Sequence, residues 1–163
     1  MPGWGVIPGP RGVDDDDATA AELEVALRPL LDTTLGAAEE LEDRIAPAHL
    51  RALQVLGTTG PAQVSTLAEA TGMLPSTASR LSDRLAAAGL VERAPSPSNR
   101  RATLLSLTRA GHDVLAELAG LRVRRLQRIL AAMDPADRDA LLRGARAYAA
   151  ASGHDRQDDR HGR

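Results

Sequence analysis

Apolar residues recur at three- and four-residue intervals along most of the chain, a period that is typical of amphipathic helices. This spacing predicts a long helix over residues 19–45, whose apolar positions are Leu23, Leu27, Leu30, Leu31, Ala38, Leu41 and Ile45. Pro29 lies inside this helix and is expected to kink it or to mark a restart, because proline removes a backbone hydrogen bond.

Start and stop residues divide the rest of the chain into shorter helices. Proline is favourable at the first position of a helix, small polar side chains cap its start, and glycine often follows its end. The residues that give these signals are Pro47, Gly57, Ser65, Gly72, Gly89, Thr108, Asp134, Pro135 and Asp137. The predicted helices span residues 47–57, 65–72, 74–89, 110–133 and 135–151.

A hairpin is predicted between the fourth and fifth of these six helices, because two short apolar runs occur at residues 90–93 and 103–108. The stretch between them is rich in proline and serine and closes on Arg100 and Arg101. Proline resists strand continuation, so the tip is expected to be an extended loop. Neighbouring residues of a strand point to opposite sides, so one arginine can enter a groove while the other meets a phosphate.

The helix before the hairpin has two distinct faces. Its predicted packing face carries Ala78, Leu81, Leu85 and Ala88. Its opposite face carries Ser76, Ser79, Arg80 and Asp83, with Thr77 and Arg84 at the edge. Together with the short helix before it, this helix has helix-turn-helix proportions. Hydroxyls and arginines can read base edges or phosphates, although serine and threonine at a helix start are also common caps.

Charge is concentrated in the same region. The whole chain has a net charge of −2, and all 20 of its basic residues are arginine. Residues 75–111 contain six arginines and two acids, a net charge of +4, so the remainder carries −6. A local basic patch of this kind is what a nucleic-acid-binding surface requires in a nearly neutral chain.

Composition excludes several other functions. The chain contains no cysteine, which removes disulfides and cysteine-based redox sensing, and its few histidines do not support a zinc site. No apolar run approaches the roughly 18 residues that span a membrane, and no secretory signal is evident, so a cytoplasmic protein is expected. No cofactor is expected. The aspartates at 14–17 are interpreted as part of a solvated tail rather than as a metal site.

The stretch "STASRLSDRLAAAGLVERAPSPSNRRATLLSLTRAG" at residues 76–111 resembles the signature of the MarR (multiple-antibiotic-resistance regulator) family of winged-helix repressors. The telling pieces are "RL" at 80–81, "DRL" at 83–85, "GLVER" at 89–93, "RR" at 100–101 and "LTRAG" at 107–111. The order of helices also matches, so the resemblance covers about residues 18–152.

The resemblance implies a mainly α fold with a small β-hairpin wing, in a homodimer that binds a pseudo-palindromic operator in double-stranded DNA and is released by a small-molecule effector. The DNA-binding residues it implies are Ser76, Thr77, Ser79, Arg80 and Arg84 in the recognition helix and Asn99, Arg100 and Arg101 in the wing. Arg101 would enter the minor groove. The implied organisation is a disordered tail (1–17), a dimerisation helix (18–46), the winged helix-turn-helix (47–108), dimerisation helices (109–152) and a second disordered tail (153–163).

One departure and several alternatives stay open. Asn99 replaces the family's usual aspartate, so the wing is held more loosely or Asp83 takes over the pairing with the wing arginine. The alternative function is a protein–protein module that has kept its dimer and lost DNA binding. An enzyme is not expected, since no catalytic constellation or phosphate loop occurs. His49 and His112 are interpreted as packing or surface residues rather than effector ligands, and the arginines at 122–128 as partners of the acids at 39–43.

Overall fold

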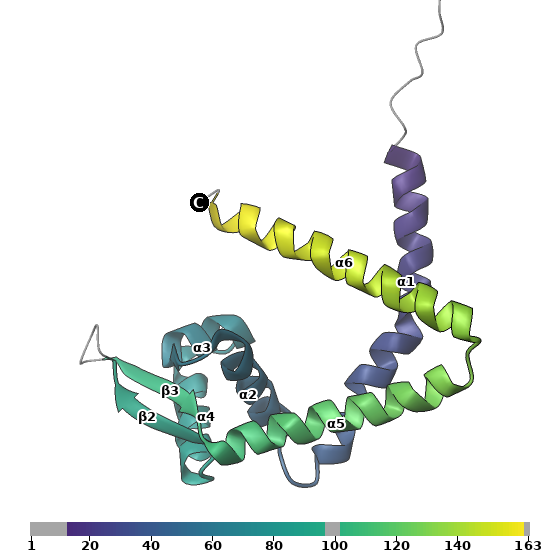
Figure 1. Ribbon diagram of the computed structural model, residues 1–163. Coiled ribbons are helices and arrows are strands. Elements are labelled where there is room, and N and C mark those ends of the chain that lie inside the picture. Colours follow the sequence, from purple (N-terminus) through teal and green to yellow (C-terminus); the bar gives the residue numbers. More distant parts are fainter. Residues whose placement is uncertain (1–12, 97–101, 162–163) are drawn as a thin grey trace, which may run out of the picture. The chain divides into compact units, whose positions relative to one another are not determined.

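The computed structural model describes residues 13–96 and 102–161, and it describes side chains for 16–96 and 102–152. The elements in chain order are α1 (Val13–Leu35), the 3₁₀ helix η1 (Glu39–Leu41), α2 (Pro47–Thr59), β1 (Ala62–Gln63), α3 (Val64–Thr71), α4 (Pro75–Ala87), β2 (Val91–Pro95), β3 (Thr103–Leu107), α5 (Arg109–Ala131) and α6 (Pro135–His161) (Figure 1). The chain divides into two compact units, one up to Arg122 and one from Val123. The predicted fold, mainly α with a β-hairpin wing, is confirmed.

The wing is part of a three-stranded antiparallel sheet in the order β1-β3-β2. Val91 pairs with Leu107, and Arg93 pairs with Leu105, which also lies opposite Ala62 of β1. β1 was not predicted, because two residues are too few to show a strand period and their partner is about forty residues away in the chain. β2 and β3 extend past β1, which fits a hairpin that projects from the domain (Figure 1).

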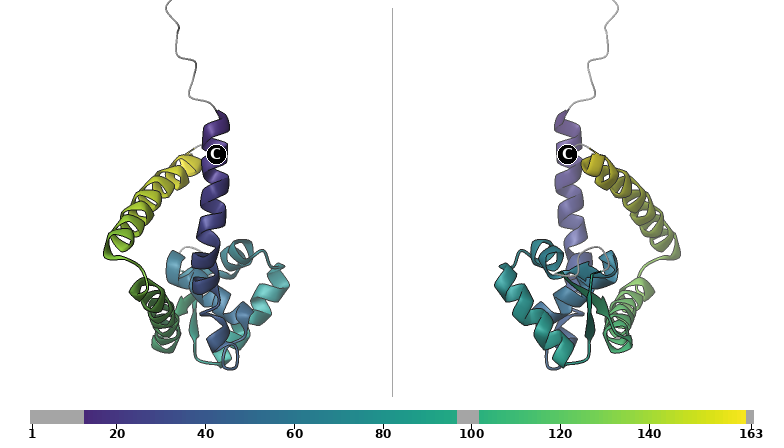
Figure 2. Two further views of the ribbon diagram at one scale, coloured as in Figure 1. Left: turned by 90° about the vertical axis from the view of Figure 1, so that its right-hand side faces the viewer. Right: turned by 90° about the vertical axis from the view of Figure 1, so that its left-hand side faces the viewer.

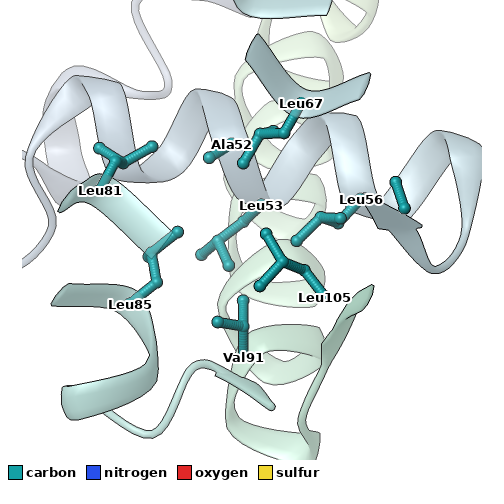
Figure 3. Packing of buried hydrophobic residues seen from close by; sticks show 9 residues of the cluster. Ala52, Leu53, Leu56, Leu67, Leu81, Leu85, Val91 and Leu105 are labelled. Carbon is teal, nitrogen blue, oxygen red and sulfur yellow. The ribbon is translucent and has the colours of Figure 1, made fainter. Parts of the chain in front are cut away.

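One hydrophobic core joins α2, α3, α4 and the sheet, and these helices group around the strands in both views of Figure 2. Its side chains point toward one another (Figure 3) and come from Ala52, Leu53, Leu56, Ala62, Leu67, Leu81, Leu85, Val91 and Leu105. Each fully buried leucine of this set contributes roughly 1.5–3 kcal/mol relative to an exposed one. The core therefore fixes α4 and the wing relative to each other.

A second hydrophobic cluster forms where the segment around η1 and the start of α2 pack against the first part of α5. It contains Ala37, Leu41, Ile45, Leu50, Leu118 and Leu121. The Arg44 guanidinium forms an ion pair with Glu117 across the same contact, and the Glu117 carboxylate raises the pKa of Arg44 above its ordinary value. Arg122 donates to the backbone oxygen of Thr34 at 3.3 Å. The pairing of the arginines at 122–128 with the acids at 39–43 stays a prediction.

The predicted first helix differs from the observed one at both ends. α1 begins at Val13, so residues 13–17 are helical and not part of a tail. Negative charge is favourable near the positive N-terminus of a helix, and Asp16 and Asp17 lie in its first two turns. α1 ends at Leu35, and residues 36–45 form turns and η1 instead of the predicted continuation. Burial of Ala37, Leu41 and Ile45 in the second cluster outweighs the helical period there.

The C-terminal helix is longer than predicted, because α6 continues through residues 153–161, which were assigned to a disordered tail. The tail was expected to begin at Gly153, but one glycine costs a helix only about 1 kcal/mol. α6 starts as predicted, with Pro135 at its first position and Asp137 in its first turn. Residues 1–12 and 162–163 of the predicted tails lie outside the described part of the chain.

Three local predictions also need correction. Gly57 was taken as a stop signal, but it lies inside α2, which continues to Thr59 and is followed by Gly60. α3 starts at Val64 with Gln63 before it and no side-chain cap, so Ser65 lies inside the helix and does not cap it. Ala88 was placed on the packing face of α4, but it follows the end of that helix and is exposed. Ser82 takes a buried position instead, and its hydroxyl donates to the backbone oxygen of Ser79 at 2.8 Å.

Within the described residues, no helix is both long enough and apolar enough to cross a membrane.

Candidate nucleic-acid interface

The turn between α3 and α4 sets the direction of α4. Gly72 adopts the left-handed conformation (φ 69°, ψ 22°) that residues with a Cβ rarely occupy. The Gly72 N–H donates to Glu69 O at 3.2 Å, and the Met73 N–H donates to Ala68 O at 2.9 Å, which closes the end of α3. The chain then enters α4 with Pro75 at its first position. Gly72 as the stop of the third helix is confirmed.

α4 presents a polar face to solvent. Ser76, Thr77, Arg80 and Arg84 are exposed, Ser79 is half-buried, and Asp83 lies on the same side. The opposite face is buried through Ala78, Leu81, Ser82 and Leu85. The structure therefore brings together the five residues that the sequence assigned to the recognition helix. Their hydroxyls and guanidinium groups are all donors that base edges and phosphates can accept.

An ion pair connects the exposed face of α4 to the wing. The Arg93 guanidinium on β2 donates to the Asp83 carboxylate on α4. Sequence reasoning left open that Asp83 would pair with the wing arginine, but its described partner is Arg93. Opposite charges at 83 and 93, on a helix and the strand that follows it, are the signal that could have found this pair. It compensates one positive charge at the interface and orients β2 against α4.

The described part of the wing ends just before its tip. Thr103 is paired with Pro95, and the Ser96 N–H donates to Ala102 O at 2.9 Å, which holds the two strands together at that point. Lower in the wing, the Ser106 hydroxyl donates to the Glu92 carboxylate at 3.1 Å. The predicted tip residues Asn99, Arg100 and Arg101 lie outside the described residues.

A polar hollow of about 270 Å³ lies between α4 and the wing. It is lined by Gln63, Val64, Ser65, Ser79, Arg93, Ala102 and Thr103. Serine, threonine and arginine side chains of this kind commonly contact sugar and phosphate oxygens, which fix the register of a protein on a duplex. The hollow thus extends the candidate interface from α4 to the start of α3 and to β3.

Thr108 joins the end of α4, the wing and α5. Its hydroxyl donates to Gly89 O at 2.6 Å and accepts from the Gly111 N–H at 3.2 Å, while its own N–H donates to Leu90 O at 3.1 Å. Thr108 was predicted as the cap of the fifth helix, and the bond to Gly111 confirms it. A Cβ at Gly111 would lie 2.2 Å from Leu90 O, so the two backbones are in direct contact.

The other candidate chemistry finds no site in the described residues. No group of three or more histidine, aspartate or glutamate side chains there is placed to hold a metal ion. His49 is half-buried at the start of α2, and His112 is exposed at the start of α5.

A helix-turn-helix with a projecting hairpin, whose exposed helix face carries hydroxyls and arginines, defines a winged helix-turn-helix protein. The model of the MarR family matches residues 45–103. The crystal structure of RV1404 from Mycobacterium tuberculosis is 34% identical, with a TM-score of 0.69 and coverage of 84% of this chain and 93% of that one. The chain belongs to the MarR family, and it is a transcriptional regulator.

Two further solved structures agree with this assignment. The transcriptional regulator Tm0710 from Thermotoga maritima is 25% identical, with a TM-score of 0.75, and 84% of this chain and 98% of that chain are covered. A MarR family protein from Bacillus stearothermophilus is 26% identical, with a TM-score of 0.67 and coverage of 84% and 97%. None of the curated proteins that were compared matches the chain.

Proposed function

We propose that the chain is a homodimeric, sequence-specific DNA-binding repressor of the cytoplasm that occupies a pseudo-palindromic operator and leaves it when a small-molecule effector binds. The observation that carries the proposal is the exposed face of α4, where three hydroxyl residues and two arginines lie beside the wing. The chain's net positive segment coincides with this face, whereas the rest of the chain is acidic.

The recognition helix would enter the major groove with its N-terminal end leading. Ser76, Thr77 and Ser79 are short donors and acceptors that suit base edges close to the helix. Arg80 and Arg84 reach further and can pair with guanine or with a phosphate. Arg100 and Arg101 at the wing tip would contact the minor groove and its phosphates, and Asn99 would orient Arg101 through a neutral hydrogen bond.

Dimerisation is supported by apolar side chains that each unit leaves exposed. In α1 these side chains are Leu23, Val25, Leu31 and Leu35. In the unit from Val123 they are Val123, Ile129, Leu141, Leu142 and Tyr148. Burying one such leucine against a second copy stabilises the pair by roughly 1.5–3 kcal/mol. A two-fold symmetric pair of recognition helices then accounts for a pseudo-palindromic operator.

Release by an effector rests on membership of the family. The family's members are generally DNA-binding proteins without enzymatic activity, and we propose the same for this chain.

The experiment selects binding sites from a random duplex library with purified protein. Fluorescence anisotropy then compares a selected duplex with its scrambled version between 50 and 200 mM salt. Phosphate contacts release counterions, so log K is expected to fall linearly with log salt, with a slope of about −0.9 for each phosphate contacted. Two subunits per selected site and a clear preference over the scrambled duplex are also expected. Salt-independent binding without sequence preference would instead favour the protein–protein module.

A further inference from the structure

Leu74 occupies a position where its side chain contributes little to the fold. It immediately precedes α4 in an extended conformation (φ −64°, ψ 143°), and its carbonyl accepts the N–H groups of Thr77 at 2.9 Å and Ala78 at 3.0 Å. Such an N-cap position favours serine, threonine, aspartate or asparagine, whose side-chain oxygen bonds a free N–H of the first turn. Leucine cannot do this, and α4 has no side-chain cap.

The side chain is not part of the core either. At 71% exposure, Leu74 is the most exposed large apolar residue of the described chain. The other strongly exposed ones lie on α1, α6 and the later part of α5, the surfaces that we propose to be covered by a second copy of the chain. In the described part of the winged helix-turn-helix, Leu74 is the one large apolar residue with an exposed side chain. Neither capping nor packing explains a leucine here.

The surroundings of Leu74 are those of a base-reading surface. Ser76 and Thr77 are exposed two and three residues after it, and Arg80 is exposed one turn further along α4. The N-terminal residues of a recognition helix lie nearest to the base edges. In the major groove, thymine differs from the other bases by its C5-methyl group, which is read by apolar contact rather than by a hydrogen bond. The hydroxyls and arginines of α4 supply hydrogen bonds, and Leu74 supplies the apolar surface.

We infer that Leu74 is a specificity-determining residue that contacts the C5-methyl group of a thymine in each half of the operator. The inference rests on the proposed function, since it needs α4 to enter the major groove. Contact removes water from the leucine and from the methyl group together. Burial of one methyl group corresponds to about a fourfold gain in affinity for each half-site.

The test is a double-mutant cycle between protein and DNA. Wild type, Leu74→Ser and Leu74→Ala are titrated by anisotropy against the selected duplex and against a copy in which 2′-deoxyuridine, which lacks only the methyl group, replaces the half-site thymines. Wild type is expected to lose about fourfold per half-site on the uridine duplex, and both variants are expected to lose little. Thymines outside the half-sites, replaced in the same way, provide the matched control.

Thermal unfolding of each variant checks that a change in DNA binding does not come from a loss of folded protein. Serine can cap α4, so Leu74→Ser is expected to unfold at the same temperature as wild type or higher. Repeating the selection with Leu74→Ser is expected to remove the preference for thymine at the contacted position. Both results support the inference.

Three results would overturn it. First, wild type could bind the thymine and uridine duplexes with equal affinity. Second, all three proteins could lose the same affinity on the uridine duplex. Third, Leu74→Ser could dissociate the dimer, which would make Leu74 a protein contact. In each case specific, salt-dependent binding by wild type would leave the proposed function standing. Failure of wild type to prefer any duplex would remove the proposed function and this inference together.

Discussion

Gly72 closes the end of α3 in the left-handed conformation, and the Thr108 hydroxyl accepts from the Gly111 N–H at the start of α5. Both roles were predicted, because a left-handed turn and a capping hydroxyl depend on neighbours within a few positions. Ser65 was assigned as a cap by the same local rule and does not act as one, since Gln63 is paired with Leu104 in the sheet and the helix starts one residue earlier. Ser82 is buried, but the pattern of apolar positions does not predict this, because serine is a polar residue.

Two glycine-to-alanine changes are expected to act in opposite directions. Alanine at Gly111 would place a methyl group 2.2 Å from the backbone oxygen of Leu90, so α5 must shift and the free energy of unfolding should fall by about 1–3 kcal/mol. Gly144 in α6 has no atom within 4 Å of the added carbon, and alanine there should raise stability by about 0.5–1 kcal/mol. Urea unfolding of both variants measures this. Equal effects would mean that the contact with Leu90 is not tight.

At the scale of elements, the helices and the hairpin were predictable because their periodicity is local. β1 was missed since its partner Leu105 is distant in the chain, and the end of α1 was missed because the second cluster draws Ala37 and Leu41 inward. The five residues assigned to the recognition helix lie together on the solvent-facing side of α4, and their role in DNA binding stays a prediction. The Arg93–Asp83 pair was not predicted, because it requires knowing that β2 packs beside α4.

Asp83→Asn tests what this pair does. Both side chains are partly exposed, so the free energy of unfolding should change by no more than about 1 kcal/mol. The affinity for DNA should change more than the stability. The substitution removes a negative charge from the proposed interface, and Arg93 can then bind a phosphate. Non-specific affinity should rise, and the slope of log K against log salt should steepen by about one. Asp113→Asn on α5 is the matched control, and an equal effect there would argue against a local role.

Substitution of the wing residue Arg101 is expected to lower operator affinity. Arg101→Ala should weaken operator binding about 10- to 100-fold through one lost minor-groove contact, while the protein stays dimeric. Anisotropy at fixed salt measures the affinity, and analytical ultracentrifugation measures the mass. Arg138→Ala on the exposed surface of α6 removes the same charge elsewhere and should leave affinity unchanged. Wild-type affinity in the Arg101 variant would show that the wing does not read the groove.

At the scale of the whole molecule, the sequence shows where charged and apolar residues are concentrated along the chain. It does not show which of the apolar residues are buried in the core and which stay exposed. Leu31 and Leu41 share the period of the predicted first helix, yet Leu41 is buried and Leu31 is 53% exposed. The difference arises because α1 ends at Leu35 and the chain then turns under α5. Domain boundaries and the dimer therefore remain predictions, whereas the fold is confirmed.

Leu31→Asp places a charge among the exposed apolar residues of α1. If a second copy covers this surface, the variant should be monomeric by sedimentation equilibrium, and operator affinity should fall by about a hundredfold or more, because the two recognition helices no longer bind as one unit. Ala48→Asp adds the same charge in the first turn of α2, an exposed position where it is favourable, and should change neither property. A dimeric Leu31 variant would place the interface elsewhere.

The Thr108 junction has a mechanical consequence. One side chain and a backbone contact couple the base of the wing to the start of α5 without an intervening flexible loop. A tilt of α5 at this end is therefore expected to move the wing and α4 together. In the dimer that we propose, a ligand or partner that turns α5 by a few degrees would change the spacing of the two recognition helices without deforming either winged helix-turn-helix.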